Sequence, residues 1–87
     1  MAYNKRQICN AIITRISVLT HCRLTADEKI DARAGMNDIL ATADHAGIPW
    51  QLQNSLLYIG EKYDVRAWYL SDLLRMACDR ANLPEPL

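Results

Sequence analysis

Apolar residues recur at helical spacing along most of the chain. In the stretch 4–22 they fall at positions 8, 12, 16 and 19, which form one stripe with the 3.6-residue period of an α-helix. Three further stretches repeat this spacing. The β-branched pair Ile12-Ile13 would also suit a strand, but the wide apolar face over 4–22 favours a helix. The pattern therefore predicts an all-α fold with helices at about 4–22, 26–46, 49–63 and 65–82.

Polar and special residues mark the ends of these stretches. Thr25 followed by Glu28 is a capping box, which predicts that a helix begins at residue 26. Gly47 can take the left-handed conformation that closes a helix, and Pro49 suits a first helical turn. Asp64 is expected to be the N-cap of the last helix. Such short connections favour antiparallel neighbours, so we expect a four-helix antiparallel bundle-like single domain over 1–87.

Two helices show features that predict their packing. Gly35 lies inside the second helix, where a glycine indicates close approach of another helix. The fourth predicted helix is apolar almost all round, which favours a place at the centre of the bundle or at a subunit interface. Its apolar residues are Trp68, Tyr69, Leu70, Leu73, Leu74, Met76, Ala77 and Ala81.

Charge is balanced overall but unevenly distributed. The chain has ten basic and ten acidic residues, yet residues 1–23 contain no acid and residues 24–47 contain five acids against Lys29 and Arg33. Either the two segments attract each other inside the fold, or a basic face is offered to an acidic partner. A neutral total disfavours binding of nucleic acid through bulk electrostatics.

The composition also indicates the cellular compartment in which the protein is expected. No stretch reaches the roughly 18 apolar residues of a membrane span, and no signal peptide opens the chain, so no membrane partner is expected. The three cysteines, Cys9, Cys22 and Cys78, show no C-x-x-C spacing. They are expected to be reduced, mainly packing residues of a cytoplasmic protein.

Residues with catalytic or metal-binding chemistry are few. His21 and His45 are the only histidines and have neither H-x-x-x-H nor H-E-x-x-H spacing, so no metal site is expected. Cys22 follows His21, but adjacent helical side chains point about 100° apart and do not form a nucleophile–base pair. No glycine-rich phosphate loop is present either. The sequence therefore predicts a protein without cofactors that is not an enzyme.

The stretch 39–58 resembles a helix-turn-helix motif. Ala43 matches the small residue of the first helix, Gly47 the turn, Ile48 the apolar residue after it and Leu56 a buried position of the second helix. The turn resembles that of LacI-type repressors, which implies a DNA-binding regulator as the alternative function. Gln53 departs from the motif, which has Val or Ile there. The second helix also lacks Arg or Lys before Lys62, so an ordinary helix corner is the simpler interpretation.

Aromatic residues exceed what a small core can easily cover. Two Trp and four Tyr occur in 87 residues, and these types are enriched at protein interfaces. We therefore expect a small non-catalytic protein-interaction module, an adaptor, regulator or inhibitor of the kind common among phage- and mobile-element-encoded proteins. Its partner is expected to be a larger protein, and a homodimer is the expected assembly. The alternative is that these aromatics are buried. The predicted partner-binding residues are Trp50, Gln51, Gln53, Asn54, Tyr58, Trp68 and Tyr69.

Overall fold

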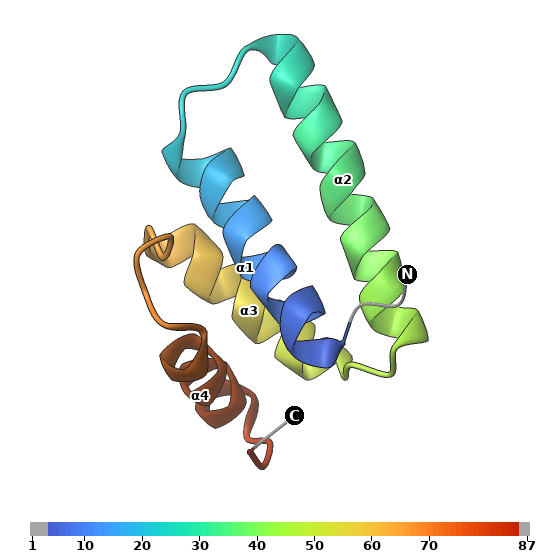
Figure 1. Ribbon diagram of the computed structural model, residues 1–87, viewed down its shortest axis with the longest axis vertical. Helices are drawn as coiled ribbons and strands as arrows, with labels where there is room; N and C mark the ends of the chain where they lie inside the picture. The colour runs from blue at the N-terminus through green and yellow to red at the C-terminus, as the bar shows by residue number, and fades with distance from the viewer. Residues whose placement is uncertain (1–3, 86–87) are drawn as a thin grey trace.

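Four α-helices make up the fold. The computed structural model describes residues 4–85, and its helices in chain order are α1 (Lys5–His21), α2 (Ala26–His45), α3 (Trp50–Lys62) and α4 (Leu70–Ala81) (Figure 1). This part of the chain contains no strand. The prediction of an all-α bundle with short connections is confirmed.

Helix α1 lies between two neighbours. It packs against α2 on one side and against α3 on the other, and α4 packs against α3. Figure 1 shows α2 running antiparallel alongside α1, with α3 crossing behind it. Between Asn4 and Glu85, no helix combines the length and the apolar character needed to cross a bilayer. Because the helices pack in the order α2, α1, α3, α4, one face of α3 and of α4 remains exposed to solvent.

The core is formed mainly by α1, α3 and α4. Helix α2 adds only Met36 and Ala43 to the buried residues, so it covers α1 rather than filling the centre. The fully buried large side chains of the core are Ile8, Ile12, Ile13, Leu52, Leu56 and Ile59. Of the stripe predicted in the first stretch, Ile8 and Ile12 are fully buried, whereas Ile16 and Leu19 are partly buried against the core.

The predicted capping box at Thr25 is present. Thr25 Oγ1 accepts the backbone N–H of Glu28 at 3.2 Å, and Glu28 Oε1 accepts the N–H of Thr25 at 3.1 Å. The backbone hydrogen bond from Thr25 holds the pKa of Glu28 below its usual value. Asn4 and Gln7 form the same reciprocal pair at the start of α1. Each such cap contributes about 1 kcal/mol to stability.

The last helix begins later than the sequence predicted. Residues 65–68 form a turn, closed by a 3.0 Å hydrogen bond from Trp68 N to Val65 O, and the N-cap of α4 is Tyr69 rather than Asp64. The Asp64 carboxylate instead accepts hydrogen bonds from the side chains of Arg66 and Ser17. The predicted helix over 65–82 is therefore wrong at its start. The predicted limits 4–22, 26–46 and 49–63 each extend about one residue beyond the observed helices.

Helix α4 is amphipathic and lies at the edge of the bundle. Its buried residues are Leu73, Leu74, Ala77 and Cys78, whereas Asp72, Arg75, Asp79 and Arg80 are exposed. The expectation of a helix that is apolar all round was wrong, because Trp68 and Tyr69 precede the helix instead of belonging to it. The central helices are α1 and α3.

Two glycines face helix α1. A Cβ atom at Gly35 of α2 would meet only the guanidinium end of the flexible Arg15 side chain and no backbone atom of α1, so the close helix approach expected at this position is not seen. Gly60 of α3, by contrast, lies close to the α1 backbone. A Cβ atom there would come within 2.8 Å of the Ile13 carbonyl oxygen and overlap the side chain of Ile16. Gly60 therefore allows α1 and α3 to pack tightly near the end of α3.

Ion pairs do not join α1 to α2. Over residues 4–85 the ion pairs within 4.0 Å are Arg66–Asp64 and Arg75–Glu85, both between exposed side chains. The opposite charges of the segments 1–23 and 24–47 thus act through solvent at longer range, where screening makes them weak. Most charged side chains of the described chain remain exposed to solvent.

Candidate partner-binding surface

One face of α3 carries side chains spaced four residues apart. Trp50, Asn54, Tyr58 and Lys62 recur at i, i+4 spacing and therefore lie along the same side of the helix. Trp50 is 66% exposed although it is a large apolar residue. It is the first residue of α3 and follows Pro49 at the N-cap, so few neighbours surround its ring. The exposed indole of Trp50 therefore lies at the N-terminal end of this face.

Helix α4 places a guanidinium on this face. Arg80 Cζ lies 3.5 Å from the centroid of the Tyr58 ring, close enough for a cation–π contact. On α3, Lys62 Nζ lies 5.5 Å from the same centroid and donates to Tyr58 Oη at 3.1 Å. This hydrogen bond lowers the pKa of Tyr58 and raises that of Lys62. One aromatic ring thus holds two cations from different helices.

Two shallow depressions run between α3 and α4 on either side of Arg80. The first has a volume of about 450 Å³ and is lined by Trp50, Gln51, Asn54, Ser55, Arg80 and Ala81. The second has a volume of about 340 Å³ and is lined by Tyr58, Ile59, Lys62, Tyr63, Met76, Asp79 and Arg80. Because Arg80 borders both, we call them together the α3–α4 groove. It brings together four of the seven predicted partner-binding residues, Trp50, Gln51, Asn54 and Tyr58.

The connection between α3 and α4 adds further aromatic surface. The Tyr63 ring, at the end of the groove, lies 5.6 Å from the Trp68 ring with an angle of 32° between the planes. Trp68 is 44% exposed and Tyr69 is 79% exposed. Tyr63 also contacts Lys62, whose Nζ lies 5.5 Å from its ring centroid. Exposed aromatic residues therefore occur at the Trp50 end of α3 and in the connection that follows its other end.

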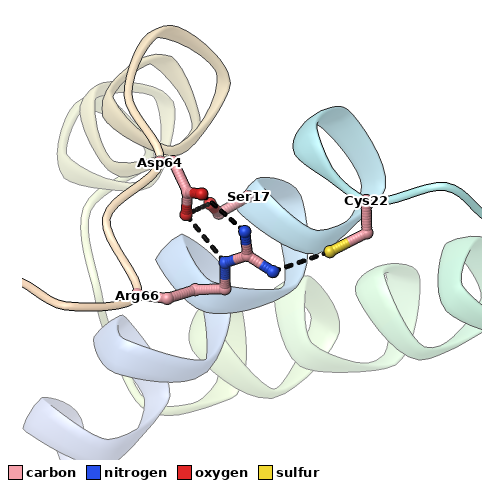
Figure 2. Close-up of polar contacts among 4 residues, drawn as sticks. All are labelled: Ser17, Cys22, Asp64 and Arg66. Carbon is pink, nitrogen blue, oxygen red and sulfur yellow. Dashed lines mark hydrogen bonds and ion pairs between the residues drawn. The ribbon is translucent and has the colours of Figure 1, made fainter.

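Arg66 ties this connection to α1. Its Nε donates to Asp64 Oδ1 at 2.7 Å, its Nη2 donates to Asp64 Oδ2, and its Nη1 donates to Cys22 Sγ (Figure 2). Ser17 of α1 donates from Oγ to Asp64 Oδ1 at 3.4 Å. The hydrogen bonds from Arg66 lower the pKa of Asp64 to about 2. This cluster anchors the segment that carries Trp68 and Tyr69, and nothing in the sequence indicated its link to α1.

Gln53 has a structural role instead of an exposed one. It is 6% exposed, and its Nε2 donates to the carbonyl oxygen of Ile48 at 2.9 Å and to Asp44 Oδ1 at 2.8 Å. Its amide therefore connects α3 to the preceding turn and to the end of α2. Because the side chain is covered, we exclude Gln53 from the binding surface, although the sequence pattern had included it.

The corner between α2 and α3 has the local geometry expected of its residues. Gly47 has a φ of 75°, and Ala43, Ile48 and Leu56 are buried as the helix-turn-helix resemblance implies. Ile48 N donates to Ala43 O at 3.0 Å, which closes the turn. These features are shared by DNA-binding motifs and by ordinary helix corners, so they do not decide between the two functions.

Arg80 is the residue of the surface that sequence reasoning missed. The helix α3 alone offers no cation before Lys62, whereas the fold brings Arg80 from α4 onto Tyr58. The two residues are far apart in sequence, and no local spacing relates them. From the sequence alone, an arginine in the last turn of an amphipathic helix is expected only to be a solvated charge near the helix C-terminus.

Groups with catalytic potential are scattered. His21 and His45 are exposed at the ends of α1 and α2, and Cys9 and Cys78 are buried free thiols. No three His, Cys, Asp or Glu side chains within residues 4–85 converge as metal ligands. Compared with protein-family models, with curated proteins and with solved structures, the chain shows no match.

Proposed function

We propose that this protein is a small non-catalytic interaction module that docks the α3–α4 groove and the adjoining aromatic residues onto a larger protein. The observation that supports the proposal is the exposure of Trp50, which lines the groove, together with the exposure of Trp68, whose ring contacts Tyr63 at the end of the groove, and of the neighbouring Tyr69. Trp, Tyr and Arg are the residues that most often dominate the energy of protein interfaces. A partner that covers these side chains would remove their apolar area from water.

The rigidity of the surface favours this function. Tyr58 is held between Arg80 and Lys62, Trp68 contacts Tyr63, and the Arg66 cluster anchors the connection. Side chains that are already positioned lose little conformational freedom when a partner binds, so more of the contact energy appears as affinity. The module would act as an adaptor, regulator or inhibitor in the cytoplasm of a host of phages or mobile elements. A homodimer formed through another face is compatible with this function.

Site-directed photo-crosslinking tests the proposal. A photoreactive phenylalanine analogue at position 51, beside Trp50, should crosslink to one protein in the native host, whereas the same group at position 30 of α2 should not. Ile30 is a suitable control because it is also an exposed apolar residue, at 64%. The crosslink at position 51 should disappear in the Trp50→Ala and Tyr69→Ala variants. Equal crosslinking from positions 30 and 51 would contradict the proposal.

Sequence-specific DNA binding is the second candidate. It is favoured by the helix corner at Gly47, which buries Ile48, and by the exposed amides of Gln51 and Asn54, which are of the type that can hydrogen-bond adenine. Binding should then be strongly salt-dependent, because phosphate contacts release counterions. Retention on duplex DNA at 50 mM NaCl that Gln51→Ala and Asn54→Ala remove would favour this candidate over protein docking.

A further inference from the structure

The chemistry of the α3–α4 groove indicates what kind of partner segment it accepts. Arg80 is the one charged residue lining the depression beside Trp50; the remaining lining consists of Trp50, the amides of Gln51 and Asn54, Ser55 and Ala81. This depression therefore combines an apolar ring, amide groups and a single positive charge. A cationic group beside a large aromatic ring is complementary to a carboxylate that neighbours an apolar side chain.

The guanidinium of Arg80 is available to such a carboxylate. Its guanidinium lies 3.5 Å from the Tyr58 ring centroid, and over residues 4–85 no carboxylate lies within 4.0 Å of its nitrogen atoms. A guanidinium that packs on an aromatic ring keeps N–H groups at its edge for a bidentate carboxylate. The two ion pairs of the described chain involve Arg66 and Arg75, so Arg80 retains its capacity for an external anion.

We infer that the α3–α4 groove binds a protein segment in which an aspartate or glutamate accompanies an apolar side chain, with the carboxylate on Arg80 and the apolar side chain on Trp50. This inference rests on the proposed function and names the chemistry of the partner. Lys62 also contacts Tyr58 and lines the second depression together with Arg80, so a second positive charge lies near the groove.

The charge of the surrounding surface favours a peptide over a nucleic acid. Residues 50–85 contain four basic side chains and five acidic ones, which gives a net charge of −1. The basic residues are Lys62, Arg66, Arg75 and Arg80, and the acidic ones are Glu61, Asp64, Asp72, Asp79 and Glu85. Asp79 lines the second depression, so a chain of phosphates along the groove would meet a negative charge there. A single carboxylate bound in the first depression would not meet this negative charge, because Asp79 does not line that depression.

Selection from a random twelve-residue peptide library displayed on phage tests the inference on the full-length protein. The selected peptides should carry Asp or Glu next to an aromatic or aliphatic residue. A fluorescent synthetic copy of the best peptide should bind Arg80→Gln at least about tenfold more weakly, as expected when a charged hydrogen bond is lost. Arg33→Gln is the matched control: Arg33 is exposed on α2, and its loss changes the net charge equally, so its affinity should stay within about twofold.

A second comparison assigns the contact. Replacing the peptide's acid by its amide should weaken binding to the wild-type protein about tenfold and should have little further effect on Arg80→Gln, because the two changes remove the same contact. Circular dichroism should show unchanged helicity of Arg80→Gln. If that variant does not fold, Arg80→Lys, which keeps the charge but not the planar group, should show an intermediate loss.

The outcomes separate this inference from the proposed function. If the selected peptides lack acids and their binding depends on Trp50 but not on Arg80, the carboxylate inference is overturned, while the proposed docking surface is retained. A selection that yields no peptide dependent on either residue would overturn both. Binding of a 20-base-pair duplex that Arg80→Gln removes would overturn the inference in favour of a nucleic acid.

Discussion

Gly60 of α3 lies against the backbone of α1 so closely that a Cβ atom at this position would come within 2.8 Å of the Ile13 carbonyl oxygen. The carbonyl belongs to the α1 backbone and cannot move without disturbing the helix. The contact fixes how α3 crosses α1, and α3 in turn carries the side of the groove that begins at Trp50. The position of the candidate surface therefore depends on this glycine.

The Gly60→Ala variant should lower the free energy of unfolding by about 1–3 kcal/mol, because an added methyl group overpacks the contact with Ile13 and Ile16. Urea unfolding followed by circular dichroism measures the change. Gly35→Ala is the matched control. Its methyl group would meet only the end of the exposed Arg15 side chain, so improved helix propensity should leave stability unchanged or raise it by up to about 1 kcal/mol. Equal effects of both variants would show that the contact is unimportant.

Gly47→Ala should also destabilise the protein, for a different reason. Gly47 has a φ of 75°, and nothing lies within 4 Å of a Cβ atom built there, so the cost is backbone strain alone. A non-glycine residue in this conformation costs about 1–2 kcal/mol. Gly47→Asn should cost less, because asparagine visits the left-handed region more readily than alanine does. Thermal unfolding of both variants tests this order, and a reversed order would contradict it.

Substitutions of Gln53 and of Trp50 should have different effects, the first on stability and the second on partner binding. Gln53→Ala removes the hydrogen bonds to Ile48 O and Asp44 Oδ1 and leaves a buried carbonyl without that donor, so it should lower stability by about 1–3 kcal/mol.

Trp50→Ala changes an exposed side chain and should alter stability by no more than about 0.5 kcal/mol while abolishing partner capture. Unfolding of the Trp50→Ala variant would instead assign Trp50 to the core.

The three thiols should react at different rates. Cys9 and Cys78 are buried, whereas Cys22 is half-buried at the surface. Burial raises the pKa of Cys9 to about 11, so this thiol is almost entirely protonated at pH 8. With a thiol-specific disulfide reagent at pH 8 we expect one fast phase, from Cys22, and two slow ones. Cys22→Ser should remove the fast phase, and its persistence in that variant would contradict the assignment.

Acid should weaken the anchor between α1 and the α3–α4 connection. The pKa of Asp64 is about 2 in the folded protein, below its ordinary value of 3.8, because Arg66 donates hydrogen bonds to the carboxylate. The unfolded chain therefore binds more protons between these values, so the contribution to stability is complete above pH 3.8 and is lost as the pH falls towards 2. NMR titration of the Asp64 carboxyl carbon measures the pKa. Arg66→Gln should move it back towards 3.8, and an unchanged value in that variant would exclude Arg66 as the cause.

Local chemistry predicted the helices well. The capping boxes at Asn4 and Thr25 and the Gly47–Pro49 junction act within a few residues, so their effect can be derived from neighbouring side chains alone. The start of α4 could not be predicted in this way. Asp64 resembles an N-cap locally, but its carboxylate joins a cluster with Arg66, with Ser17 of α1 and with Cys22, the residue that follows α1, and this cluster is a tertiary arrangement.

The candidate surface was predicted only in part. Trp50, Asn54 and Tyr58 were predicted as binding residues from their aromatic or polar character, and their i, i+4 spacing places them on one face of α3. Gln53 was assigned to the same surface, yet it lies one position from Asn54 and points to the turn, where Ile48 O and Asp44 accept its amide protons. A glutamine is polar wherever it lies, so its burial depends on acceptors that only the folded corner supplies.

The sequence by itself determined the number of helices, most of their ends and the stripes they bury, because these follow from interactions between residues within a few positions of each other. The tertiary structure decided which helices are central, how closely Gly60 lets α3 approach α1, and that Arg80 of α4 lies on Tyr58 of α3. These relationships join residues distant in the chain. They depend on how whole helix faces fit together, and no local pattern encodes that fit.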